Sequence, residues 1–143
     1  MSKLVIVQCG GSKIWKNNPN LGKVEAKSAY VSPYFHKNRL YAEKYGDSWI
    51  ILSAKYGFIL PDEKIEDYNV TFKSKKTGPI SLSDLREQVI KKQLHQYDEV
   101  IVLGGKEYLE AVNKAFQNTD CQISSPFEGL PIGKRMSEIN KVL

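Results

Sequence analysis

Short runs of consecutive apolar residues alternate along the chain with longer segments in which apolar residues recur every three or four positions. The runs at 4–7, 49–52 and 100–103 consist mostly of Val, Ile and Leu, and a weaker run stands at 121–123. A continuous apolar run of this length predicts a strand buried on both faces, as the strands of parallel sheets are. We therefore expect a sheet of about four strands.

Helical spacing fills the segments between these runs. The first helix is expected from Pro33 to Gly46, because Ser32 is a good N-cap and Pro and Gly suit a helix start and end. Further helices are expected over 81–94, 108–116 and 136–143. Parallel strands need crossover helices on both faces. The order therefore predicts an α/β fold, a three-layer α/β/α sandwich around a mostly parallel sheet.

Two segments follow neither pattern. Residues 14–27 are polar and contain Asn-Asn-Pro-Asn, which predicts an excursion over the surface. Residues 57–79 show no clear period. A loop of that length inside a small domain is usually functional or mobile, so its polar residues are candidates for a site.

Composition indicates one globular domain, residues 1–143. The hydrophobic share of 41% and the charged share of 26% exclude a disordered or fibrous chain. No apolar run approaches the roughly 18 residues of a membrane span and no signal-peptide pattern opens the chain, so we expect a cytoplasmic protein without a membrane partner. Two cysteines are too few for a four-ligand zinc site, and we expect reduced thiols, no metal and no cofactor.

The net charge of +5 is unevenly distributed. Residues 1–46 hold eight Lys or Arg against two Glu, a net +6, so the rest of the chain is close to neutral. This asymmetry suits a phosphate-bearing partner and is equally common as a basic surface that keeps a protein soluble.

Ligands of open parallel sheets bind outside the carboxyl ends of the strands, and two glycine turns stand there. The first consists of Cys9, Gly10, Gly11, Ser12 and Lys13, and the second of Gly104 and Gly105. Unobstructed backbone N–H groups, a hydroxyl and an ammonium can hold a phosphate or carboxylate, or the turns simply connect elements. The spacings of Walker and dinucleotide-binding motifs are absent, so those enzyme classes have little support.

A third strand end and the long loop hold the remaining candidates. Lys55 can bind an anion and Tyr56 can stack on a base or bond a sugar, or the pair is a snorkelling Lys beside a core Tyr. Asp62, Glu63 and Asp67 lie just beyond this strand end in sequence and can act as general acid or base, or form a solvated acidic loop. Cys9 has no compelling His partner, which argues against covalent catalysis.

Several of these segments together resemble a bacterial and phage family of unknown function. The resemblance rests on Cys9-Gly-Gly-Ser-Lys13, Ala29-Tyr30-x-Ser32-x-Tyr34-Phe35, Leu52-Ser-Ala-Lys-Tyr-Gly57, Leu60-Pro-Asp-Glu63 and Tyr68-Asn69. The arrangement is more distantly similar to the catalytic domain of archaeosine synthase, a tRNA-modifying enzyme. That resemblance implies a uracil-glycosylase-like or nucleoside-processing α/β sandwich, with Cys9, Ser53, Lys55, Asp62 and Tyr68 near the ligand. The RNA-binding module of the tRNA enzyme has no counterpart in this chain.

These observations lead us to expect an enzyme that acts on a nucleobase, nucleoside or nucleotide, most concretely at an N-glycosidic bond. The lysine and glycine turns would hold phosphate or sugar, Tyr56 or Tyr30 would stack the base, and a carboxylate would stabilise the oxocarbenium-like centre or activate water. One alternative is a non-catalytic binder, or sponge, of a small phosphorylated signal. A nucleic-acid-binding protein is a weaker alternative, because no RNA- or DNA-binding motif is present.

Overall fold

A computed structural model describes residues 2–143 and places the apolar runs side by side in one sheet. Within these residues the sheet has five strands in the order β4-β3-β1-β6-β7. Their bounds are β1 Lys3–Gln8, β3 Ser48–Ser53, β4 Gly57–Ile59, β6 Glu99–Leu103 and β7 Gln122–Ser124. All neighbouring pairs are parallel except β3 and β4, which are antiparallel. The predicted mixed α/β class and mostly parallel sheet are confirmed, with one strand more than expected.

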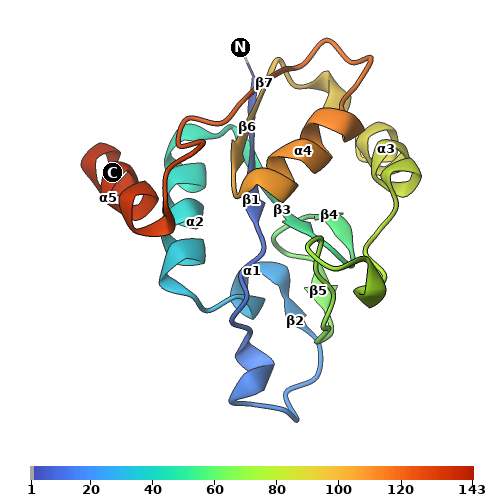
Figure 1. Ribbon diagram of the computed structural model, residues 1–143, viewed down its shortest axis with the longest axis vertical. Coiled ribbons are helices and arrows are strands. Elements are labelled where there is room, and N and C mark those ends of the chain that lie inside the picture. The colour runs from blue at the N-terminus through green and yellow to red at the C-terminus, as the bar shows by residue number, and fades with distance from the viewer. Residues whose placement is uncertain (1) are drawn as a thin grey trace.

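Four long helices cover this sheet in two pairs. They are α2 Pro33–Tyr45, α3 Leu82–Lys91, α4 Lys106–Ala115 and α5 Ile132–Val142. Helix α2 packs against α5 and α3 packs against α4, and Figure 1 shows the two pairs on opposite sides of the strands. The apolar residues of β1 and β6 and the last four residues of β3 are buried almost completely, which explains why these runs are apolar without alternation.

Local signals placed the start of α2 correctly and that of α5 four residues late. Ser32 caps α2 by accepting a hydrogen bond from the Phe35 N–H at 3.2 Å, and Pro33 takes the first helical position. Helix α5 begins at Ile132, not at Met136, because the N–H of Arg135 already bonds the Pro131 carbonyl. The sequence Pro-Ile-Gly suggests a loop, but a proline just before the first helical residue is compatible with a helix start.

The two segments without a clear pattern contain short elements. Strand β4 begins at Gly57, whose φ of +76° is the left-handed conformation that glycine tolerates, and turns back along β3. Strands β2 Val24–Glu25 and β5 Lys64–Ile65 form an antiparallel pair. The short helix α1 Ala26–Ala29 follows β2 directly in the sequence. Trp15 is buried, so the polar excursion is anchored in the core. These elements are too short for a periodic signal.

The order of connections creates a switch point at the end of β1. The chain leaves β1 through α2 to reach β3, then passes through α3 on the opposite face to reach β6 on the other side of β1. The loops after β1 and β6 therefore lead to opposite faces of the sheet and leave a crevice between them. Open α/β sheets bind their ligands in a crevice of this kind. Because β1 and β6 are parallel neighbours, both glycine turns lie at one edge, as predicted. No helix within residues 2–143 combines the length and apolar character needed to cross a membrane.

Candidate functional site

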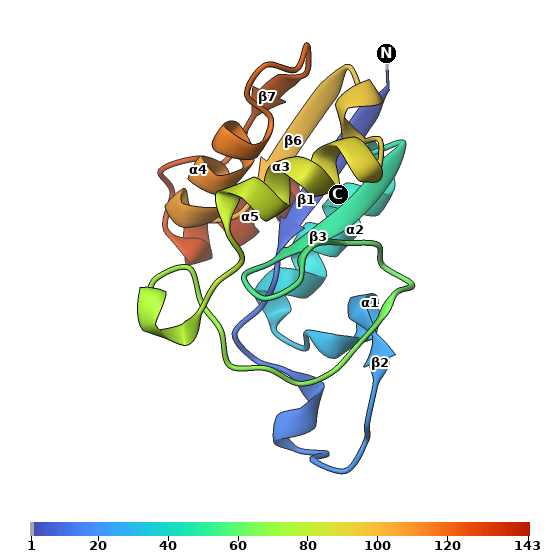
Figure 2. The same cartoon turned by 90° about the vertical axis from the view of Figure 1, so that its right-hand side faces the viewer.

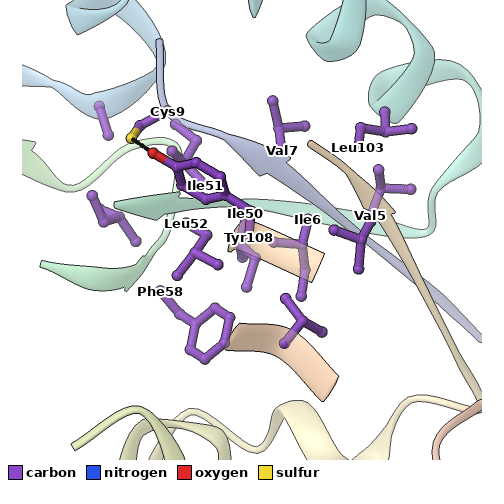
Figure 3. Close-up of a cluster of buried hydrophobic side chains, with 14 of the residues drawn as sticks. Val5, Ile6, Val7, Cys9, Ile50, Ile51, Leu52, Phe58, Leu103 and Tyr108 are labelled. Carbon is purple, nitrogen blue, oxygen red and sulfur yellow. Dashed lines mark hydrogen bonds between the residues drawn. The ribbon is translucent and has the colours of Figure 1, made fainter. Parts of the chain in front are cut away.

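The carboxyl ends of β1, β3 and β6 bring together a thiol and several hydroxyl groups. Cys9 follows β1 directly, Ser53 ends β3, and Tyr108 projects from the first turns of α4 after β6. The Cys9 sulfur lies 3.2 Å from the Tyr108 hydroxyl, a contact that Figure 3 shows at the margin of the apolar core. The side chains of Tyr30 and Tyr68 come from the loops that follow α1 and β5. We call these five residues the edge cluster.

The hydroxyls of the edge cluster form a buried chain of hydrogen bonds. The Tyr30 and Tyr68 hydroxyls lie 2.6 Å apart, and the Ser53 hydroxyl donates to Tyr68 at 3.0 Å. Ser53 in turn accepts hydrogen bonds from the N–H groups of Lys55 and Tyr56 at 3.1 and 3.2 Å. Since Ser53 is fully buried and Tyr30 is 4% exposed, these bonds replace water for groups that would otherwise be costly to bury.

Burial keeps the phenols of this cluster neutral. It raises the pKa values of Tyr30, Tyr68 and Tyr108 above the ordinary tyrosine range, and the nearby Cys9 thiol, which is negative when ionised, adds to the increase. The cluster therefore offers neutral hydrogen-bonding groups over the physiological pH range. Positive charge at this edge comes from lysines.

Two lysines lie on tyrosine rings at the same edge. The Lys13 ammonium is 4.5 Å from the centre of the Tyr68 ring, and the Lys55 ammonium is 5.1 Å from the centre of the Tyr56 ring. Among residues 2–143, no carboxylate lies within 4.0 Å of either ammonium. Both charges are thus available to an anion.

The second glycine turn is packed directly against the end of β1. The Gly105 N–H donates to the Gln8 side-chain oxygen at 2.7 Å. A Cβ on Gly104 would lie only 3.0 Å from the Gln8 Cβ and 3.2 Å from the Tyr108 Cβ, so any side chain at this position would have to displace its neighbours. The sequence interpretation missed Gln8. The one available signal was a polar residue at the end of an apolar strand.

The first glycine turn is ordered by pairing with a neighbouring segment. The Ser12 carbonyl accepts a hydrogen bond from the Val31 N–H at 3.0 Å, and Lys13 forms an isolated bridge with Tyr30. Gly10 lies close to the N-cap of α2, whereas Gly11 and Ser12 are exposed with open space around Gly11. The turn therefore presents its backbone to solvent beside the edge cluster.

Residues 66–80 cover the edge cluster. The Glu66 N–H donates to the Tyr56 hydroxyl at 3.2 Å, and the Ile80 N–H donates to the Ala54 carbonyl at 2.7 Å. Between these anchors Phe72 packs edge-on against Tyr108, with ring centres 5.2 Å apart. Figure 2 shows the segment crossing below the sheet to the start of α3.

Two hollows open beside the turns that follow β6 and β3. A hollow of about 410 Å³ is lined by the start of α4, by residues 128–131 and by Arg135. A second hollow of about 660 Å³ is lined in part by Lys55, Tyr56 and the start of α3. Predicted ligand-binding residues therefore line both hollows, Gly104 and Gly105 the first and Lys55 and Tyr56 the second.

The predicted catalytic carboxylates are divided between the two ends of the sheet. Asp62 and Glu63 line a hollow of about 500 Å³ together with Leu4 and Ser48, which stand at the amino ends of β1 and β3. Their expected position beyond the carboxyl end of β3 is wrong, because the antiparallel β4 carries the chain back along β3. Asp67 comes after β5 and directly precedes Tyr68 of the edge cluster. Its carboxylate accepts a hydrogen bond from the Tyr68 N–H at 2.9 Å.

Both carboxylates at the amino end are paired with lysines. The Lys27 ammonium donates to Asp62 at 2.7 Å, and this hydrogen bond and charge lower the pKa of the Asp62 carboxyl. Lys92 lies 3.0 Å from Glu63. Within the part of the chain that the structure describes, no three His, Cys, Asp or Glu side chains gather as a metal site would require.

Comparison with known proteins places the chain in a family without an assigned function. Residues 4–141 match the model of a family described as a family of unknown function, DUF6884. The chain is also 36% identical over 147 residues to the uncharacterized protein YfjM of Bacillus subtilis strain 168, a match that covers all of this chain and 96% of that protein. The expected membership in a family of unknown function is confirmed, and neither description names a ligand or a reaction.

Proposed function

We propose that this chain, which belongs to the family of unknown function DUF6884, binds a nucleoside or nucleotide at the carboxyl edge of β1, β3 and β6. The observation that carries the proposal is the switch point between β1 and β6. It is bordered by two glycine turns and by two lysines that have no carboxylate partner in the described part of the chain. The expected three-layer sandwich and the likeness to archaeosine synthase point in the same direction.

The geometry supports a division of roles along this edge. The ammonium groups of Lys13 and Lys55 attract a phosphate, and the exposed Gly11 backbone offers an N–H group beside them. Tyr56 is half-buried and lines an open hollow, whereas Tyr30 is almost fully buried. Tyr56 is therefore the better of the two for stacking a base.

The reaction we propose is hydrolysis of the N-glycosidic bond, with Asp67 as the carboxylate. Water adds through its oxygen to the anomeric carbon and gives a proton to the carboxylate, while the base leaves with the electrons of the C–N bond and takes a proton from solvent. The carboxylate then returns its proton to solvent. Asp67 is favoured because it adjoins Tyr68 of the edge cluster, unlike the other two candidates. The alternative is a sponge that binds its ligand without turnover. It is favoured because Asp62 and Glu63 lie toward the amino ends of the strands, away from the proposed binding site.

Binding is tested by calorimetry with the four common nucleosides, their 5′-monophosphates and cyclic nucleotides. Lys13→Ala and Lys55→Ala should each weaken binding of a monophosphate about 10- to 100-fold, the usual value of a charged hydrogen bond. Lys3→Ala, at the opposite end of β1, is the matched control and should bind as the parent does. If both edge variants keep full affinity, the proposed site is wrong.

Turnover is tested by chromatography for released base. Asp67→Asn should lower the rate by roughly 10²- to 10⁴-fold while binding persists. A ligand recovered intact and stoichiometric after heating the protein, with no free base formed by the parent, would establish the sponge instead.

A further inference from the structure

Gln8 is a polar residue at the switch point between β1 and β6. It is the last residue of β1, the central strand of the sheet, and it lies beside Gly104 at the end of β6. Only one of the two polar atoms of its side chain has a hydrogen-bond partner within residues 2–143. The oxygen accepts the Gly105 N–H at 2.7 Å, and no hydrogen bond within residues 2–143 uses the nitrogen.

The contact with Gly105 determines which way the amide faces. A backbone N–H can donate only to the side-chain oxygen, so the NH₂ group must occupy the other position. Gly104 lies beside the stem of this side chain, since a Cβ added to Gly104 would be only 3.0 Å from the Gln8 Cβ. A donor that is held in one orientation at a strand end is preorganised for an acceptor, because its rotamer entropy is already lost.

We propose that Gln8 is a ligand-binding residue whose NH₂ group donates a hydrogen bond to an acceptor atom of the nucleobase. This inference rests on the proposed function and extends it to the selection of the base. A neutral amide with fixed orientation discriminates between ring or carbonyl acceptors and amino groups, which is how Gln and Asn read base edges. The two lysines already supply the charge that a phosphate needs. Gln8 therefore contributes selectivity between bases.

The test compares three variants by calorimetry with the four nucleosides and their 5′-monophosphates. Gln8→Glu keeps the length of the side chain and an oxygen for the Gly105 N–H, but replaces the donor with an acceptor. Gln8→Met keeps the length and removes both functions. Gln122→Glu, at the amino end of β7, makes the same chemical change at the other end of the sheet. Thermal melting and the NMR shift of the Gly105 amide verify that the turn is intact.

The parent should prefer one base, and Gln8→Glu should bind the preferred nucleoside and its monophosphate about 10- to 100-fold more weakly, by the same factor for both. Gln122→Glu should bind as the parent does. A loss confined to the monophosphate would overturn the assignment to the base. Parental affinity in Gln8→Glu with a loss only in Gln8→Met would show that Gln8 merely supports Gly105, and would also overturn it. A parent that binds none of the probes would refute the proposed function itself, whatever the variants do.

Discussion

The polar side chains at the two ends of the sheet differ in burial and in their partners. At the carboxyl end, Ser53, Tyr30 and Tyr68 are buried and bond to one another, while Lys13 and Lys55 have no carboxylate partner among residues 2–143. At the amino end, the Asp62 side chain is 77% exposed and paired with Lys27. Exposed ion pairs contribute little to stability and exchange readily with water. The comparison shows that residue type alone does not mark a site, because Asp62 and Glu63, two of the three candidate carboxylates, stand at the end where lysines already neutralise them.

The largest expected effect tests how tightly the carboxyl end is packed. Gly104→Val should lower the free energy of unfolding by about 1–3 kcal/mol, because the new side chain meets Gln8 and Tyr108 where a Cβ is already too close. Urea denaturation measures the change. Gly105→Ala is the matched control, since its Cβ would lie 3.6 Å from its nearest neighbours, and it should cost less than about 1 kcal/mol. Equal losses for both variants would contradict the close packing at Gly104.

An effect of intermediate size is expected on folding stability at alkaline pH. The folded pKa values of Tyr30, Tyr68 and Tyr108 lie above the ordinary value near 10, so the unfolded chain loses these protons first. The stability they contribute is complete below pH 10 and falls as the pH rises beyond it toward the folded values.

Two measurements check this dependence. Thermal melting between pH 9 and 11.5 should show a falling midpoint, and absorbance near 295 nm should show these three phenols ionising only on unfolding. Tyr68→Phe removes one of the three groups and should make the alkaline loss shallower. If all eight tyrosines of the chain ionise near pH 10 in the folded protein, the edge cluster is open to water.

The smallest effect is expected at the amino end. The pKa of Asp62 is lowered by Lys27, so the contribution of this pair is present above the unfolded pKa near 4 and is lost as the pH falls through the folded value. Asp62→Asn should leave the melting temperature nearly unchanged at pH 7, because the pair is exposed. The same variant should also leave nucleotide binding and any release of base unchanged. A loss of turnover of 100-fold or more would return catalysis to the amino end and break the comparison.

The strands and helices show how much of the secondary structure could be predicted from local sequence patterns. The three strong apolar runs became β1, β3 and β6, and Ser32 with Pro33 marked the start of α2. The reversal at Gly57 was missed because β4 has only three residues, too few for a period. That single omission misplaced Asp62 and Glu63, since a loop leaving a strand end and a hairpin returning along the strand lead to opposite ends of the sheet.

Local patterns were enough to predict the α/β class, the mostly parallel sheet and the common edge of the two glycine turns, because apolar periodicity and turn residues act over a few neighbouring positions. Which polar groups meet at that edge depends instead on the folded arrangement of the whole chain. Cys9 and Tyr108 are 99 positions apart, and Gln8 and Gly105 are 97 apart. Such contacts follow from the order of strands and the path of the long loop, which depend on the packing of the whole chain and leave no local signal in the residues themselves.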